Sequence, residues 1–353
     1  MKNNVSAAGT LMLALALGSC QKLSEPMYEE EDGLACSLTL EFTGIDVGTK
    51  VLGQDITKEC TIHDVQIFVF NSSTGKLDAA KRVASLNAVT QYDFTESIEC
   101  TQGPREVWAL VNAPVNHVDG AASDMVTRLD DLKSKTCVLT DNSPDHLVMS
   151  GSLSAVLNSA SQNLSVSVSR LCASVVLESV TNEMYLPAYQ KQGKLKILGA
   201  YLMNVPAQQN YEKTLSAKTL PQTSWISANA KSGEAAQKAL TQDVYNEVVE
   251  LNQKLGKVST FYAFPNDADP SESATWSQRA TMLVVEAEVD GNQCVYPVQL
   301  GELAPNTKYQ VSLKIHRMGS DPSRPWEKIR FDAVTPLVTI ADWTVGAPVS
   351  TEI

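Results

Sequence analysis

Residues 36–43 of the chain read CSLTLEFT, and this alternation indicates a β-strand. Apolar side chains fall on every second position, which is typical of a strand with one buried and one solvated face. They are Cys36, Leu38, Leu40 and Phe42. Similar short apolar segments recur at residues 65–70, 107–111, 147–149, 164–180, 195–203, 261–264, 281–289, 295–300, 309–315 and 334–343. Strands therefore dominate the expected structure.

Helical spacing is confined to two segments. Apolar residues recur at positions 244, 248, 251 and 255, with Thr241 or Asp243 as the N-cap and Gly256 as the stop. A shorter apolar set at positions 125, 129 and 132 follows Ser123. Residues 290–292, Asp-Gly-Asn, predict a hairpin turn because these residue types tolerate positive φ. Many strands with two helices in the connections predict a mainly all-β fold of antiparallel β-sandwiches.

The length and charge of the chain limit its class. With 353 residues, 43% of them hydrophobic, it is long enough for two domains with cores of their own. The polar stretch at residues 182–194 predicts domains over residues 35–183 and 184–353, with a cut nearer Leu171 as the alternative. The 40 acidic and 28 basic side chains give a formal net charge of −12, which excludes nucleic acid as an expected partner.

The first 34 residues predict export. A short basic start, a mainly apolar stretch at residues 5–17 and small residues before position 20 are typical of a signal peptide over residues 1–19. The run LGSC at residues 17–20 resembles the bacterial lipobox, in which the cysteine after the cut carries the acyl chains of a membrane anchor. Cys20 is therefore the predicted lipidation site, Gln21 favours the outer membrane, and residues 20–34 form an acidic tether. A plain signal peptide with an incidental cysteine is the alternative.

No catalytic, metal or cofactor site is predicted. The four histidines lack a metal-ligand spacing, and the chain contains neither a phosphate-binding glycine loop nor a GxSxG elbow. The cysteines after Cys20, at positions 36, 60, 100, 137, 172 and 294, have long, irregular spacings without a CxxC pair. We expect mostly free core thiols and leave a Cys60–Cys100 disulfide open. The expectation is a protein that is not an enzyme.

Strands near the two ends of the chain are its strongest functional feature. The strand at residues 36–42 is short and follows a tether, so a strand of another molecule can in principle replace it. Residues 334–343 are a candidate replacement. The alternative is that both are permanent strands of their own domains, and the strand patterns alone favour this second interpretation.

Nine short motifs are spread along nearly the whole chain. The first half carries IHDVQIFVFN at residues 62–71, REVWALVN at 105–112, LVMSG at 147–151 and VSRLCASV at 168–175. The second half carries LGAYLMN at 198–204, FYAFPND at 261–267, VYPV at 295–298, NTKY at 306–309 and IADW at 340–343. In this order and spacing the motifs resemble those of the fimbrillins, the type V pilus subunits of Bacteroidales.

The resemblance implies a fold, a mode of assembly and a set of partners. Fimbrillins are exported as lipoproteins, fold as two transthyretin-like β-sandwich domains and polymerise by strand exchange after a protease removes the first strand. The implied partners are other pilus subunits, outer-membrane lipid through Cys20, the processing protease, and host or bacterial surface ligands. Carried over to this chain, the displaced strand comprises Cys36, Leu38, Leu40 and Phe42, and the donor region includes Val338, Ile340 and Trp343.

The loop after the first strand departs from the family pattern. Cleaved members usually offer an arginine there, whereas this loop contains only Lys50 and Lys58, and the first arginine of the chain is Arg82. Either the protease cuts between Lys50 and Val51 and yields a stalk subunit, or the subunit stays uncut and lipid-bound as a basal anchor. The resemblance therefore implies a pilus subunit at the cell surface in one of these two roles.

Two other classes of function remain as alternatives. A surface glycan-binding outer-membrane lipoprotein needs an exposed aromatic platform, for which Trp225 and Trp276 are the candidates. A hydrolase needs converging carboxylates or histidines in a cleft, and the sparse use of histidine disfavours it.

Overall fold

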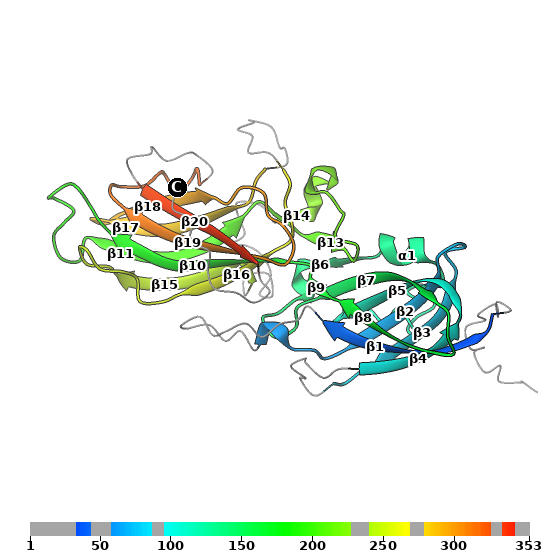
Figure 1. The fold of residues 1–353 in the computed structure, drawn as a ribbon. Helices are drawn as coiled ribbons and strands as arrows, with labels where there is room; N and C mark the ends of the chain where they lie inside the picture. The colour runs from blue at the N-terminus through cyan, green and yellow to red at the C-terminus, as the bar shows by residue number, and fades with distance from the viewer. Residues whose placement is uncertain are drawn as a thin grey trace, which may run out of the picture.

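The computed structural model describes residues 33–43, 58–86, 95–226, 240–268, 279–325 and 334–342 of the chain. These residues form two β-sandwiches, which lie at the two ends of the molecule in Figure 1. The mainly all-β fold class is thereby confirmed. No helix within the described ranges is long and apolar enough to cross a bilayer.

The first sandwich consists of a five-stranded sheet in the order β3-β2-β5-β7-β9 and a three-stranded sheet in the order β4-β1-β8. Apolar side chains of both sheets belong to one buried core. The strands are β1 Ala35–Thr43, β2 Val65–Asn71, β3 Leu77–Val83, β4 Thr95–Thr101, β5 Gly103–Val111, β7 Met149–Leu157, β8 Ser161–Ser167 and β9 Ser169–Arg170.

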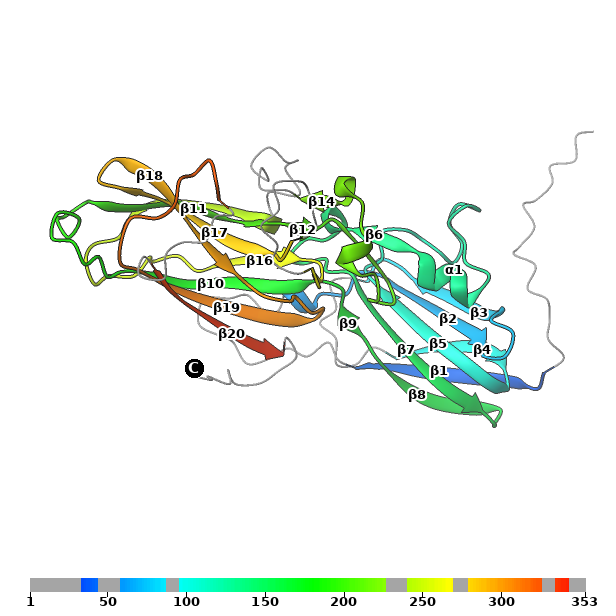
Figure 2. The same ribbon diagram turned by 90° about the horizontal axis from the view of Figure 1, so that it is seen from above.

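The second sandwich consists of two four-stranded sheets, in the orders β16-β10-β19-β20 and β15-β11-β17-β18. Figure 2 shows the long strands of this sandwich from above, with β20 beside β19. The strands are β10 Ala173–Asn182, β11 Leu195–Met203, β15 Gln242–Val248, β16 Ser259–Ala263, β17 Met282–Val289, β18 Asn292–Gln299, β19 Thr307–Ile315 and β20 Val334–Asp342.

Short elements connect the sandwiches. Two two-stranded ladders pair β6 Thr136–Val138 with β13 Gln208–Asn210, and β12 Val205–Pro206 with β14 Trp225–Ile226. The helical elements of the described residues include α1 Leu129–Ser134 and the 3-10 turns Lys58–Cys60, Leu139–Asp141, Ala217–Thr219 and Gln222–Ser224.

The change from one sandwich to the other occurs just after β9. β10 falls within the range expected for the first domain, yet it pairs with β16 and β19 of the second sandwich. We therefore propose a domain boundary between β9 and β10, close to Leu171, instead of one at residue 183.

The helix predicted over residues 244–255 is wrong. Residues up to 248 belong to strand β15, which pairs with β11, and a turn follows it. Val244 and Val248 share the outer face of this strand, because residues four apart lie on one face of a strand as well as of a helix. The ladder to β11 and the strand preference of valine decide between the two. The second expected helix is confirmed in a shorter form, α1, with Leu132 buried.

Two further details differ from the expectation. Each sandwich contains one parallel pair, β1 with β8 and β10 with β19, instead of antiparallel pairs alone. The apolar segment at residues 164–180 is divided among β8, β9 and β10, and the weakly apolar strands β3 and β4 were not expected.

The cysteines agree with the expectation of free core thiols. All six cysteines within the described residues are buried and unpaired by disulfides, so the Cys60–Cys100 bond left open above is not formed. Cys60 instead lies 3.1 Å from Nη2 of Arg170, which donates to its sulfur.

Candidate functional site

The first strand occupies the centre of its sheet. β1 pairs antiparallel with β4, from Ala35 opposite Thr101 to Glu41 opposite Thr95, and parallel with β8 along its other edge. Figure 2 shows β1 beside β8 along the length of the first sandwich. Removal of β1 would therefore open a slot between β4 and β8. The backbone N–H and C=O groups that these two strands direct toward β1 would lose their hydrogen-bond partners.

The predicted displaced strand shows the expected two faces. Its inward row is fully buried, with 0% exposure for Cys36, Leu38 and Leu40 and 3% for Phe42. Burial of a Leu or Phe side chain stabilises a fold by about 1.5–3 kcal/mol, so the three larger side chains contribute on the order of 5–9 kcal/mol. An empty slot would expose this apolar floor to water, and another strand with a similar row would cover it.

The outward face of β1 makes only exposed polar contacts. Ser37 Oγ donates to Glu99 Oε1 at 2.7 Å, and the hydroxyls of Thr39 and Ser97 lie 3.1 Å apart. Such exposed contacts contribute little to stability. The strand is held by its two ladders and its apolar row.

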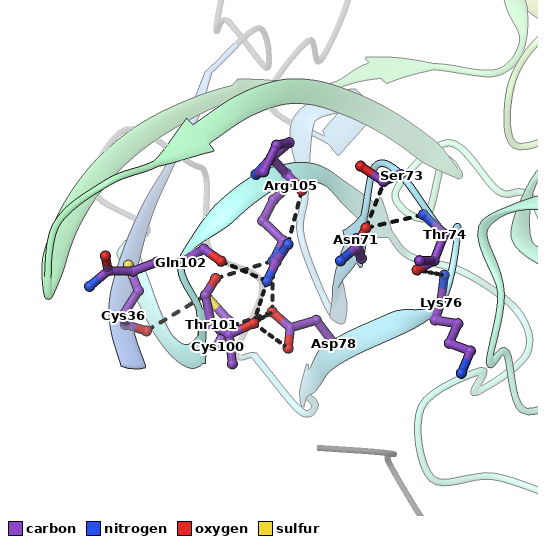
Figure 3. A network of polar contacts seen from close by, with 11 residues as sticks. Cys36, Asn71, Ser73, Thr74, Lys76, Asp78, Cys100, Thr101, Gln102 and Arg105 are labelled. Carbon is purple, nitrogen blue, oxygen red and sulfur yellow. Dashed lines mark hydrogen bonds and ion pairs between the residues drawn. The ribbon is translucent and has the colours of Figure 1, made fainter. Parts of the chain in front are cut away.

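A buried ion pair shapes the slot where β1 begins (Figure 3). Arg105 Nε on β5 lies 2.9 Å from Asp78 Oδ2 on β3, with side-chain exposures of 3% and 8%. Asp78 also accepts hydrogen bonds from the backbone N–H and the hydroxyl of Thr101, and Arg105 donates to the carbonyl of Gln102 at 2.9 Å. This network fixes the corner between β4 and β5 with groups from β3, β4 and β5.

The start of β1 docks on that corner. The backbone N–H of Gln102 donates to the carbonyl of Leu34 at 2.7 Å, and its side-chain amide donates to the carbonyl of Ala35 at 3.1 Å. The Asp78–Arg105 pair and its bonds to Thr101 and Gln102 include no β1 atom.

The chain after the loop at residues 44–57 is anchored on its own. Tyr262 of β16 donates to buried Glu59 at 2.7 Å, and Arg170 Nε donates to the Glu59 carbonyl at 3.1 Å. Burial and the adjacent Glu59 carboxylate raise the pKa of Tyr262 well above its usual value. A cut in this loop therefore separates β1 from a chain that remains attached to both sandwiches. The expected processing residues Lys50 and Val51 lie outside the described residues, as does Cys20.

The predicted donor region forms an edge strand. β20 pairs with β19 over its whole length and is the last strand of its sheet. Val338 packs partly buried against the core, whereas Leu337 and Ile340 are 48% and 58% exposed. Trp343 lies outside the described residues. β20 is therefore less buried than β1, and the structure places the two strands in different sandwiches.

A segment between the sandwiches, which the sequence did not reveal, fastens one to the other. Tyr211 is buried, its hydroxyl lies 3.2 Å from His117 Nε2, and its carbonyl accepts from Ser150 Oγ at 2.6 Å. Lys213 Nζ donates to the Ser150 carbonyl at 2.8 Å and to Ser169 Oγ at 2.6 Å. Burial lowers the pKa of Lys213 to about 8 and also lowers the pKa of His117. The lysine has no sequence signal beyond its ordinary loop context.

The alternative functions require either a cluster of metal-binding or catalytic side chains or an exposed aromatic platform. Within the described residues no group of three or more His, Cys, Asp or Glu side chains could hold a metal ion. Trp225 is half-buried on the short strand β14, and Trp276 lies outside the described residues. No aromatic platform made by both tryptophans is therefore visible in the described part of the chain.

Comparison with known proteins shows which proteins share this architecture. Residues 42–186 match the family model described as "Major fimbrial subunit protein (FimA)". A "putative cell adhesion protein" from Bacteroides eggerthii DSM 20697 shares the fold with a TM-score of 0.65 and 17% identity, over 89% of this chain and 97% of that chain. The fimbrilin (fimA) from Porphyromonas gingivalis W83 does so with a TM-score of 0.59 and 16% identity, over 88% and 98%.

The tip fimbrial protein Mfa3 from Porphyromonas gingivalis, with a C-terminal truncation, also shares the fold, with a TM-score of 0.52 and 12% identity over 88% of this chain and 100% of that chain. No curated protein matches the sequence significantly.

The fold and the site define a two-sandwich β-protein with a single strand closing the first sandwich. The match to the fimbrial subunit family begins at the end of β1, covers the rest of the first sandwich and supports a fimbrillin family for this chain. The resemblance seen in the motifs is thereby confirmed. Because this is a family of fimbrial subunits and not of enzymes, the expectation of a non-enzymatic protein is confirmed as well.

Proposed function

We propose that the chain is a structural subunit of a cell-surface pilus, joined to neighbouring subunits by replacement of β1. The observation that carries the proposal is the position of β1: one strand at the front of the chain supplies both the ladder partners of β4 and β8 and an apolar row. The other sheet of that sandwich, β3-β2-β5-β7-β9, has ladders that do not involve β1. A strand from a second subunit would restore the same ladders and the same burial.

The donor is the region of β20, and a proline limits which part of it can act. Pro336 has no backbone N–H, which an edge strand tolerates but a strand paired on both sides does not. The inserted segment therefore begins after Pro336. Val338 and Ile340 then lie two residues apart on one face, with the spacing of Leu38 and Leu40. Trp343 follows at the end of this region.

Export as a lipoprotein through Cys20 completes the proposal. Acylated Cys20 holds the precursor in the outer membrane, and a protease that cuts after Lys50 leaves Val51 as the first residue of a stalk subunit. A subunit that is never cut keeps its lipid and acts as the basal anchor. Since the exchanged contacts are similar in energy, departure of the cut peptide makes the exchange irreversible.

The test uses the secreted full-length precursor under reducing conditions. Trypsin-like cleavage after Lys50 is expected to yield ladders that resist SDS, and Lys50→Gln is expected to prevent them, with Lys76→Gln as the control outside the loop. Deletion of residues 334–353 is expected to leave cleaved monomers. If the cleaved, complete chain stays monomeric, or if the deletion leaves the ladders unchanged, the proposal fails.

A further inference from the structure

We propose that Cys36 and Cys100 form a disulfide bond that ties β1 to β4 after export. The bond itself requires only an oxidising compartment, while its effect on assembly rests on the function proposed above. It gives the strand a covalent latch that is independent of the loop at residues 44–57.

The two cysteines face each other across the ladder. Cys36 of β1 is the direct antiparallel partner of Cys100 of β4, and both are buried on the core side of the sheet. Figure 3 shows them side by side, and the Cys100 sulfur lies 3.6 Å from the Cys36 carbonyl oxygen. Directly opposed antiparallel residues have Cα atoms about 4.5–5.5 Å apart. A disulfide accepts Cα separations of roughly 4.4–6.8 Å, so the bond needs no rearrangement of the backbone.

The other ladder cysteines lack such a partner. Cys294 of β18 lies opposite Ala287, and Cys137 of β6 lies opposite Gln209. Among the strand-to-strand pairs that the structure describes, Cys36 with Cys100 is the one in which two cysteines are in register.

The chemistry requires an external disulfide as oxidant. One cysteine, as thiolate, attacks a small-molecule disulfide or an oxidised dithiol oxidoreductase, forms a mixed disulfide and releases one thiol. The second cysteine attacks the mixed disulfide and releases the second thiol. Two cysteine thiols lose their protons and two electrons, and one oxidant disulfide becomes two thiols.

The folded environment of Cys100 determines when the disulfide can form. Burial, Cys36 and Asp78 raise the pKa of Cys100 to about 12, so the attacking thiolate is scarce once β1 is in place. The bond therefore forms while the chain folds in the oxidising compartment, before β1 closes over Cys100.

The latch lies at the end of β1 opposite the processing loop. A cut in that loop frees the end of β1 next to Thr43, whereas Cys36 is the first buried residue at the other end. An oxidised subunit would keep its cut strand in the slot until a reductant opens the bond. Proteolysis and reduction would then both be required before a donor strand enters.

The experiment begins with the uncut, full-length mature chain. After refolding with a mixture of oxidised and reduced glutathione, the chain is alkylated in denaturant and digested. The expected result is one cross-linked peptide pair containing Cys36 and Cys100, which disappears after reduction and in Cys36→Ala but persists in Cys294→Ala. Alkylation of both cysteines in most molecules of the wild type would overturn the proposal. No polymerisation is needed for this measurement.

A second measurement tests the latch. The oxidised chain is cut in the loop and separated on denaturing gels with and without reductant. We expect the β1 peptide to remain attached without reductant and to separate with it, and we expect SDS-resistant ladders only after reduction. Release of the peptide without reductant from oxidised chain would contradict the latch. Absence of ladders from fully reduced, cut chain contradicts the proposed assembly instead, so the two failures are distinguishable.

Discussion

Substitution of one residue on β1 distinguishes a β1 that stays in the subunit from a β1 that is replaced during assembly. Leu40 is completely buried between Glu96 of β4 and Leu164 of β8 in the ladder register. Leu→Ala in a core costs about 2–5 kcal/mol of the free energy of unfolding. At about 1.4 kcal/mol per factor of ten, Leu40→Ala lowers the folded-to-unfolded ratio of the uncut chain by roughly 30-fold to several thousand-fold. Equilibrium unfolding in urea measures this change.

The assembled fibre should not share this loss. If β1 leaves, fibres of Leu40→Ala subunits contain only the donor strand in the slot, so they should resist heating in SDS as well as wild-type fibres do. The matched control is Leu110→Ala, an equally buried leucine on β5 that stays in the subunit. This control should weaken the uncut chain and the fibre alike. The reasoning is refuted if Leu40→Ala weakens the fibre as much as Leu110→Ala does.

Three further predictions concern the anchors of the subunit. Arg105→Met leaves Asp78 buried without its ion partner and is expected to lower the free energy of unfolding in urea by about 3–5 kcal/mol. The control Lys194→Met removes the half-exposed ion pair with Asp290 and should lower it by at most about 1 kcal/mol. Equal losses in the two variants would contradict the role of the buried pair. Because burial lowers the pKa of Lys213 to about 8 from 10.5, its charged form destabilises the fold below that pKa, and stability is regained as pH rises from about 8 to 10.5. The stability of the wild type relative to Lys213→Met should therefore rise across this window, by at most about 3 kcal/mol, and a flat difference would refute the pKa argument. Finally, Cys20→Ala should move the exported protein from the detergent phase to the aqueous phase in detergent partitioning, and retention in the detergent phase would exclude Cys20 as the lipid site.

The strand at residues 36–43 could be predicted from the sequence because the pattern that indicates it is local. A period of two in the sequence is sufficient to predict which side chains β1 buries, and Cys36, Leu38, Leu40 and Phe42 are indeed the buried row. The central position of β1 in its three-stranded sheet could not be predicted from the sequence. It depends on a parallel ladder to β8, more than a hundred residues further along the chain, and no local pattern encodes that pairing.

The misread helix shows the limit of periodicity. Val244 and Val248 satisfy both a helical and a strand spacing, and the ladder to β11 selected the strand. The pairing of Cys36 with Cys100 was not predicted for a related reason. β4 reads TESIECT, whose polar content gives a weak strand signal, so the sequence offered Cys60 and not Cys36 as the partner of Cys100. The contacts of Tyr211 and Lys213 between the sandwiches likewise depend only on tertiary structure.

The most direct test of strand replacement is the N-terminal residue of subunits isolated from fibres. Edman sequencing or mass spectrometry of the purified fibre should find subunits that begin at Val51 and lack residues 36–43, with acylated Cys20 restricted to an uncut anchor. Fibres in which subunits throughout still begin at Cys20 and retain β1 would contradict the account.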